Sequence, residues 1–203
     1  MCIIEGPKED KPGWSAFLRH LVDRGLSGVQ LIVSDACRGL MESVAEYLPD
    51  VRWQRCVVHF YRNVFSLVPS GKVREVSRML KAIHAQEDRK AAAGKMEAVI
   101  SELRRQKLTR AAELLEESGH ETLTYYAFPD SHWIKLRTNN PLERIMREIR
   151  RRTRVVGAFP DGKSCLNLAA ARLRHIAGTQ WATRKYMNMT PLFADQTQGT
   201  VVA

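Results

Sequence analysis

The stretch GVQLIVSD, residues 28–35, decides which class of fold this chain can adopt. It is short, apolar, rich in β-branched residues and bounded by glycine, a pattern typical of a buried strand in a parallel sheet. The segment VRWQRCVVH, residues 51–59, predicts a second strand, and a helical pattern from Leu40 to Leu48 lies between the two. Strand, helix and strand in this order predict a βαβ unit with two parallel strands and a right-handed crossover.

Asp35 ends the first predicted strand. The carboxyl ends of parallel strands meet at one edge of the sheet, and α/β folds place chemistry there. An aspartate just before a helix can equally be its N-cap, so both interpretations stay open. Cys56 and His59 are expected at the end of the second strand, beside Asp35. Their C-x-x-H spacing is half of a zinc-ligand pattern, but no second Cys/His pair stands at a matching interval, which disfavours structural zinc.

Outside these strands the apolar spacing is helical. One helix is predicted around residues 14–22, with Gly25 as its stop, and another from about residue 163 to 177. Residues 60–126 show helical spacing throughout, with four helices whose charged faces are expected to be solvated surface. The polar tail after Leu192 is expected to be disordered.

The segment TNNPLERIMREIRRRTR, residues 138–154, predicts a further helix that starts at its Asn-Asn-Pro. Apolar residues at i, i+3, i+4 and i+7 form one stripe that should pack on a core: Leu142, Ile145, Met146 and Ile149. Arginines occupy much of the remaining surface: Arg144, Arg147, Arg150, Arg151, Arg152 and Arg154. Six arginines against two glutamates leave a charge of +4, which suits the binding of a polyanion through its phosphates.

Glu143 lies in the first turn of this arginine-rich helix. If Asn140 is the N-cap, Glu143 is at position N3 and can complete a capping box. Alternatively, its carboxylate is held among arginines where a metal ion and a phosphate would meet. Asp35 and Glu143 together could hold two Mg²⁺ about 4 Å apart for phosphodiester transfer, in a site that usually needs a third acid from the same sheet.

The composition narrows the classes of function. The chain has 203 residues, a hydrophobic content of 44% and a net charge of +10, which indicates one domain, or one with a large insertion, and a nucleic acid or acidic partner. Four scattered cysteines predict a reducing compartment rather than a disulfide scaffold. No membrane span or signal peptide is expected, and neither a Gly-rich nucleotide loop nor a Ser/His/Asp arrangement is recognisable.

Three motifs together resemble the mutator family of bacterial insertion-sequence transposases: SDACRGL at 34–40, WQRCVVHFYRN at 53–63 and TNNPLERIMREIRRRTRVVGAFPD at 138–161. The resemblance runs from about Gly6 to Leu192. It implies a DDE transposase, in which an RNase H-like fold cuts and joins DNA at transposon ends using a divalent metal, Mg²⁺ or Mn²⁺. The implied partners are transposon-end DNA, target DNA, and either a further copy of the chain or a full-length transposase. The implied location is the bacterial cytoplasm, at the nucleoid, with no membrane partner.

By this resemblance, Asp35 matches the second catalytic Asp and Glu143 matches the catalytic Glu, and both would bind the metal. Cys56 and His59 match the C-x-x-H element of the family and would support catalysis. The six arginines of the helix would neutralise DNA phosphates: Arg144, Arg147, Arg150, Arg151, Arg152 and Arg154.

The implied architecture is an incomplete RNase H-like α/β fold, a few-stranded sheet with flanking helices and a large all-helical insertion. Residues 1–59 and 138–192 would form the remnant of the catalytic domain, 60–137 the insertion domain, and 193–203 a disordered tail. The first catalytic Asp of the family belongs to a strand upstream of Met1, and the earlier acids here lack a buried-strand context: Glu5, Glu9, Asp10 and Asp23.

These expectations describe the C-terminal part of a truncated transposase. Such a chain would be catalytically inactive by itself, or would need the missing half to be supplied by another protein molecule. Two alternatives stay open on the sequence. One is a non-catalytic fragment that binds DNA or interferes with a full-length transposase. The other is a decayed gene product without a stable fold, because the missing strands would leave an exposed sheet edge.

Overall fold

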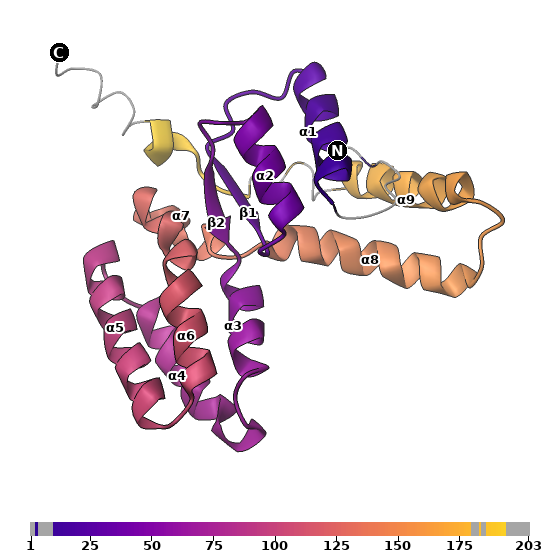
Figure 1. Cartoon of the computed structure of the whole chain (residues 1–203). Helices are drawn as coiled ribbons and strands as arrows, with labels where there is room; N and C mark the ends of the chain where they lie inside the picture. The colour runs from indigo at the N-terminus through magenta and orange to yellow at the C-terminus, as the bar shows by residue number, and fades with distance from the viewer. Residues whose placement is uncertain (1–2, 4–9, 180–182, 184–185, 194–203) are drawn as a thin grey trace, which may run out of the picture. The chain divides into compact units, whose positions relative to one another are not determined.

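A computed structural model of the chain describes residues 3, 10–179, 183 and 186–193 (Figure 1). The described residues fall into two compact units. The first unit takes its residues from 1–29, 37–50 and 139–203, and the second from 30–36 and 51–138. The strand tail predicted at Cys2–Ile4, apart from the irregular Ile3, lies outside the described residues. The same holds for the tail predicted at 193–203, apart from Phe193, which is helical.

The second unit contains a parallel pair of strands, β1 (Leu31–Ser34) and β2 (Arg52–Arg55). Leu31 lies opposite Arg52 and Ser34 opposite Arg55, so the two strands end together. The predicted α/β class and the parallel pairing are confirmed. Both strands are shorter than predicted, and β1 is half-buried along most of its length rather than buried.

The prediction that the second strand continues to His59 is wrong. β2 stops at Arg55, and helix α3 (Val57–Phe65) begins two residues later. The apolar residues explain the difference, because Val57, Phe60 and Val64 are buried at a spacing of three and four, which is helical. The run from Cys56 to Val58 that suggested a strand core is therefore the start of this helix.

The rest of the second unit is helical, as predicted for residues 60–126. It contains α3, η1 (Ser70–Lys72), α4 (Val73–Ile83), α5 (Arg89–Arg105), α6 (Thr109–Ser118), η2 (Gly119–Ala127) and α7 (Asp130–Leu136), where η marks a 3₁₀ helix. The largest apolar side chains in the core of these helices are fully buried: Phe60, Leu80, Ile83, Ile100, Leu103, Leu115 and Leu123. Helix α7 was not anticipated from the sequence.

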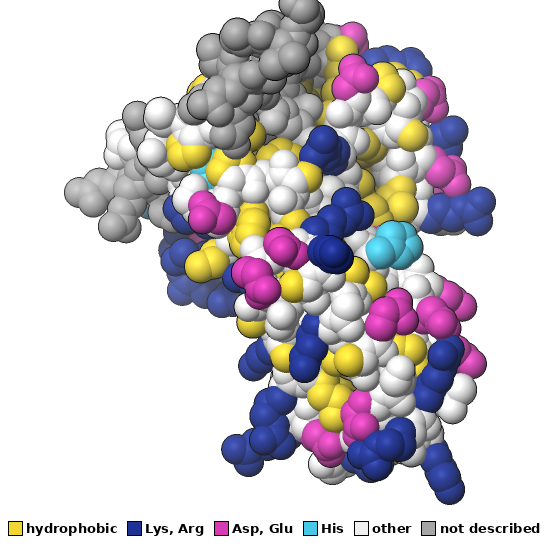
Figure 2. Space-filling model, turned by 90° about the vertical axis from the view of Figure 1, so that its left-hand side faces the viewer, with side chains coloured by type: hydrophobic (Ala, Val, Ile, Leu, Met, Phe, Trp, Pro, Cys, Tyr) yellow, Lys and Arg dark blue, Asp and Glu magenta, His cyan; other side chains and the backbone are white. Residues whose placement is uncertain are grey.

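The charged faces of α3 to α6 are largely exposed, as the amphipathic pattern predicts. Figure 2 shows Lys and Arg interspersed with Asp and Glu over the lower part of the molecule, where these helices lie. Several of the opposite charges pair at the surface, including Arg104 with Glu116 at 2.6 Å and Arg105 with Glu102 at 2.7 Å. Such exposed pairs contribute little to stability because water screens them, so this surface is chiefly a solvated one.

Buried polar groups join the sheet to η2. The Gln54 side chain on β2 donates to the Thr122 carbonyl at 2.9 Å and accepts from the Tyr125 N–H at 2.9 Å. The neighbouring Arg55, with a side chain that is 7% exposed, pairs with Glu121 at 2.9 Å. A buried amide must be hydrogen-bonded to be tolerated, so these bonds fix η2 against β2. The sheet and the helical segment consequently belong to one compact unit.

The first unit begins with a pair of helices, α1 (Lys11–Asp23) and α2 (Arg38–Tyr47). Asp10 caps α1 by accepting the Gly13 N–H at 3.1 Å. The chain leaves this helix through Gly25, whose φ of 90° is the left-handed conformation expected of a glycine stop. Small polar residues hold the two helices together, since Ser15 and Ser43 share a hydrogen bond of 3.0 Å.

Gly39 permits the close approach of α2 to the start of α1. A Cβ at this position would lie 2.6 Å from the Lys11 nitrogen and 2.7 Å from the Asp10 carbonyl carbon. Both neighbours are backbone atoms, which cannot move aside as a flexible side chain can. The Gly of the SDACRGL motif is therefore explained by packing.

We expect Gly39→Ala to destabilise the first unit by about 2 kcal/mol, because the extra methyl group forces one helix to shift. Denaturant unfolding followed by circular dichroism measures this difference. Gly94→Ala is the matched control, because Gly94 also lies in a helix and a Cβ there meets nothing within 4 Å. Equal stability of the Gly39→Ala variant and the wild type would contradict the packing role.

The first unit also contains α8 (Asn140–Val156) and α9 (Gly162–Ala177), which runs back alongside α8 (Figure 1). Both helices were predicted, but the prediction that the apolar stripe of α8 packs on a core is wrong. No residue of α8 is buried, and Leu142 and Met146 are 55% and 37% exposed. Helix α9 buries Ala169 alone. This pair of helices is held together by charged as well as apolar side chains.

Candidate functional site

Asp35 directly follows β1, at the edge of the sheet where both strands end. Its side chain is exposed. Helix α2 has Cys37 as its N-cap, with no side-chain capping bond, so the alternative that Asp35 caps this helix is not what the structure shows. Two hydrogen bonds of the Ser34 hydroxyl fix the backbone at Asp35. Trp53 Nε1 donates to Ser34 Oγ at 2.8 Å, and Ser34 Oγ donates to the Asp35 carbonyl at 2.7 Å.

Cys56 and His59 belong to the same end of the sheet as Asp35. The Cys56 N–H donates to the Ser34 carbonyl at 2.7 Å, which continues the ladder by one step beyond β2. Cys56 is fully buried and is the N-cap of α3, while His59 is half-buried in the first turn of that helix. The structure thus places the C-x-x-H element on a strand-to-helix junction next to Asp35 along the ladder, and not on a strand.

Arg137 fixes the end of α7 to this junction, and sequence reasoning did not single it out. Its carbonyl accepts the Val57 N–H at 3.0 Å, one residue beyond Cys56. Its guanidinium donates to the His84 carbonyl at 2.6 Å and lies 5.5 Å from the centre of the Tyr125 ring. The sequence signal for Arg137 is weak, because an arginine near the end of a short segment reads as surface. The segment that leads into α8 is therefore attached at the edge of the sheet that carries Asp35.

Helix α8 begins one residue earlier than predicted, with Asn139 as its N-cap and Pro141 in its first turn. The Asn139 side chain makes no capping bond, and Glu143 comes one position after the N3 place that a capping box requires. Glu143 is half-buried. Its own backbone N–H donates to the Asn139 carbonyl at 3.1 Å, the first bond of the helical ladder. The N-cap at Asn139 thus leaves Glu143 outside the N3 position from which the capping box was predicted.

Glu143 shares one face of α8 with three arginines. Successive residues of an α-helix are rotated by about 100°, so positions i, i+4, i+7 and i+11 stay within about 60° of one another. Glu143, Arg147, Arg150 and Arg154 have this spacing. The three arginines are exposed and form no ion pair with any residue that the structure describes. We call Arg147, Arg150 and Arg154 the arginine stripe.

The other side of α8 is partly neutralised by Glu148. Its carboxylate pairs with Arg151 at 3.0 Å and Arg152 at 3.5 Å within the helix, and with Arg172 of α9 at 2.6 Å. The hydrogen bond from Arg151, followed by the charges of Arg151, Arg172 and Arg152, lowers the pKa of Glu148. Two of the six arginines predicted to bind DNA, Arg151 and Arg152, are consequently paired with a carboxylate of their own helix. Arg144 lines a small cavity of about 240 Å³ between α8 and α9.

The predicted site residues therefore fall into two groups. Asp35, Cys56 and His59 meet at one edge of the sheet in the second unit, while Glu143 and the arginines lie on α8 in the first unit. Within the described ranges, no three or more His, Cys, Asp and Glu side chains gather into a group that could hold a metal ion. Within its described residues, neither unit therefore holds a complete donor set for a two-metal site. None of the described helices combines the length and apolar character needed to cross a membrane.

Comparison with known proteins adds the deciding observation. The sequence profile described as Transposase, Mutator family, matches residues 1–183. The chain belongs to the Mutator family of transposases. The family resemblance inferred from the three motifs is confirmed by this match.

Curated transposases of insertion sequence elements are similar over most of this chain. The transposase for insertion sequence element IS1081 of Mycobacterium tuberculosis is 39% identical over 184 residues, which cover 91% of this chain and 44% of the relative. The IS406 transposase of Burkholderia multivorans is 40% identical, with 90% and 47% covered. The IS256 transposase of transposon Tn4001 from Staphylococcus aureus is 31% identical, with 89% and 46% covered. The chain thus spans a little under half the length of these relatives.

Proposed function

We propose that this chain carries part of the active site of a DNA transposase, which cleaves and transfers DNA strands at the ends of an insertion element. The observation that carries the proposal is the match of residues 1–183 to the Mutator family. In this proposal the parallel strands belong to an RNase H-like fold and residues 60–137 form its helical insertion. Asp35 and Glu143 are the metal-binding carboxylates, and Cys56 and His59 support them.

The position of Asp35 agrees with this role. It is exposed where two parallel strands end, and it is not used as a helix cap. Groups in this position can face a bound substrate because the chain turns outward there. Cys56 and His59 follow β2 at the same edge, so they are available to shape the surroundings of that carboxylate.

The match to the Mutator family supports the assignment of Glu143 as a second metal-binding carboxylate beside Asp35. A divalent metal such as Mg²⁺ or Mn²⁺, when bound, would supply charge stabilisation to the reacting phosphodiester.

The whole reaction is best tested in a protein of full family length. We suggest a chimera in which residues 1–183 replace the matched segment of the IS1081 transposase, expressed with a marked element that carries the IS1081 ends. The proposal expects transposition that depends on the inserted segment and, with purified protein, on Mg²⁺ or Mn²⁺. A folded chimera that binds the ends but never cleaves or joins DNA would contradict it.

We assign DNA backbone binding to the arginine stripe of α8. Guanidinium groups on one exposed helix face can each neutralise a phosphate, and binding then weakens as salt rises because counterions are released. Arg151 and Arg152 contribute less in this proposal, because they already pair with Glu148. The net charge of +10 favours the encounter with DNA but does not by itself locate the interface.

The triple variant Arg147→Ala, Arg150→Ala, Arg154→Ala should reduce the slope of log affinity against log salt by about 2.7, because each phosphate contact contributes about 0.9. Fluorescence anisotropy with a labelled duplex at several salt concentrations measures this slope. The matched control is Arg74→Ala, Arg78→Ala, Lys81→Ala, which removes three exposed charges from one face of α4. If the control lowers the slope as much as the stripe variant, the binding is not localised on α8.

A further inference from the structure

The turn between α8 and α9 exposes an unusual amount of apolar surface. Residues 155–160 read VVGAFP, without a single polar side chain. Val155 is 83% exposed and Val156 is 49% exposed, while Ala158 and Pro160 are also exposed and Phe159 is half-buried. One exposed valine is ordinary, but a continuous apolar tip at the end of a helix pair suggests a surface that another molecule covers.

The backbone holds this tip in a tight reversal. Gly157 has φ 79° and ψ −80°, and the Ala158 N–H donates to the Val156 carbonyl at 3.1 Å. These values define a γ-turn of the positive-φ kind, which is strained and which glycine adopts most easily. The turn ends α8 abruptly and keeps Val155 and Val156 at the extremity of the helix pair.

The helices on either side give the tip a rigid base. Arg172 of α9 pairs with Glu148 of α8 at 2.6 Å, and this carboxylate is also held by Arg151. Asp161 caps α9 by accepting the Ser164 N–H at 2.6 Å, immediately after the turn. That hydrogen bond lowers the pKa of Asp161, so the cap is charged at neutral pH. The turn is therefore braced by charged contacts on both of its helices.

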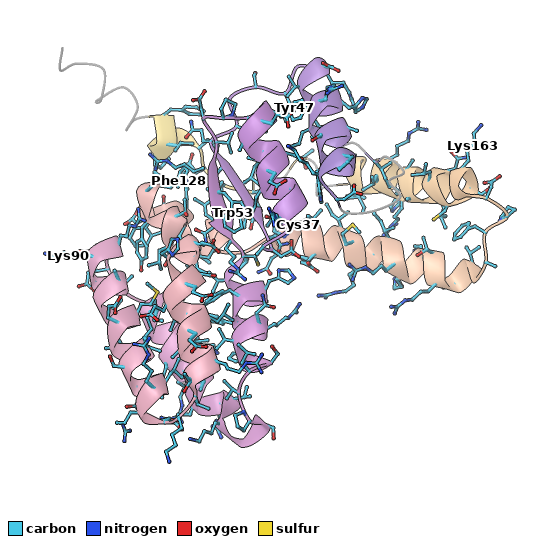
Figure 3. All side chains as sticks on the ribbon, in the orientation of Figure 1. Cys37, Tyr47, Trp53, Lys90, Phe128 and Lys163 are labelled. Carbon is cyan, nitrogen blue, oxygen red and sulfur yellow. The ribbon has the colours of Figure 1, made fainter. Side chains whose placement is uncertain are left out.

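Basic residues flank the apolar tip on both helices, beside the single carboxylate of Asp161. Arg154 directly precedes it and belongs to the arginine stripe, and Lys163 stands at the end of α9 that adjoins the turn (Figure 3). Arg152 precedes the last turn of α8 and pairs with Glu148. An apolar tip flanked by cations on both helices complements a duplex groove, where phosphates line the rims and base faces become accessible when a step is opened. A purely apolar protein partner would gain nothing from these cations.

We propose that the α8–α9 turn is a wedge that enters a groove of duplex DNA and partly unstacks a base step, with Val155 and Val156 as the apolar contacts. This inference rests on the proposed function, because it takes DNA as the partner of α8. It assigns the arginine stripe to the phosphates and the turn to the bases. The wedge would distort DNA at a point set by the length of α8.

Duplex DNA that contains 2-aminopurine tests the wedge, because this base fluoresces more strongly when it is unstacked. The wild-type chain should raise the fluorescence severalfold at saturation. The double variant Val155→Ser, Val156→Ser should lose most of that rise and bind about 3–10-fold more weakly, with an unchanged salt slope because no cation is removed. Val155→Phe should give a larger rise, because a larger apolar side chain separates bases more effectively.

Ile134→Ser is the matched control, since Ile134 is 76% exposed on α7 in the second unit. It should leave both the fluorescence and the affinity unchanged. The arginine stripe variant should bind more weakly and reach the wild-type fluorescence at saturating protein. Thermal unfolding of every variant checks that the fold is kept.

The possible outcomes separate the wedge from the proposed function. Wild-type binding without a fluorescence rise, or a rise that Val155→Ser, Val156→Ser preserves, overturns the wedge and leaves DNA binding intact. No binding at low salt overturns the DNA proposal together with the wedge. Self-association that the double variant abolishes, in the absence of unstacking, would assign the turn to a second copy of the chain and overturn the wedge.

Discussion

Replacing Asp35 with Asn, or Glu143 with Gln, is expected to reduce transposition by the chimera about 1000-fold or more. Each change keeps the size of the side chain and removes its negative charge. A carboxylate that stabilises a reacting phosphodiester through a bound cation contributes several kcal/mol, and about 4 kcal/mol corresponds to a 1000-fold change in rate. The frequency with which a marked element moves in cells measures the effect, and cleavage of end DNA by the purified proteins confirms it.

Two exposed acids serve as controls for this loss. Asp50→Asn changes a carboxylate near the other end of β2, and Glu117→Gln changes one on α6. Both variants should transpose like the unmodified chimera, and all four should bind DNA with similar affinity. Near-normal transposition by Asp35→Asn would contradict its catalytic assignment, whatever Glu143→Gln does.

Lowering the pH from 6.5 to 4 is expected to cost the second unit up to roughly 3 kcal/mol through His84 alone. Burial lowers the pKa of His84 to about 4, from an ordinary value of 6.5, and the nearby charge of Arg137 acts in the same direction. A hydrogen bond with the Leu80 carbonyl opposes the shift. The unfolded chain therefore takes up the proton first, so this stability is complete above pH 6.5 and is lost as the pH falls towards 4.

Urea unfolding between pH 4 and 7 measures this dependence. Acidic groups also titrate in this range, so the informative quantity is the difference between the wild type and His84→Gln, which has no imidazole to protonate. The variant should be less stable at pH 7, because His84 also contacts Thr122 at 2.9 Å, and its stability should change less with pH. His120→Gln, at an exposed histidine of η2, should keep the wild-type slope. Parallel pH profiles for the wild type and His84→Gln would contradict the assignment.

The class of fold could be predicted because hydrophobic period is a local property. The two parallel strands, the four helices after them and the two final helices were all foreseen from spacing alone. The position at which the strand changes to a helix, after Arg55, could not be predicted, because Cys56, Val57 and Val58 are compatible with either structure. What decides it is the burial of Phe60 and Val64 against helices that come much later in the chain.

The residue types of the candidate site could be predicted from the sequence, but the residues that hold the site in place were harder to predict. Asp35 stood out because it ends an apolar run, and Glu143 because it sits at a helix start among arginines. Arg137 acts through its backbone carbonyl and through contacts with His84 and Tyr125, which leave no local pattern. The apolar stripe of α8 led to the opposite error, the prediction of a buried face that is exposed in the structure. Helical spacing predicts such a face but does not show which residues would cover it.

The bonds from Gln54 to η2 have a consequence for how the protein folds. They join residues 68 positions apart in sequence, with the helices from α3 to α6 in between. Contacts of such long sequence separation form late and slowly, because the loop between them must close first. During synthesis, β2 would leave the ribosome well before its partner Thr122 exists. The sheet edge that carries Asp35 would then become rigid only after the helical segment has folded, so lengthening that segment would delay the edge as well.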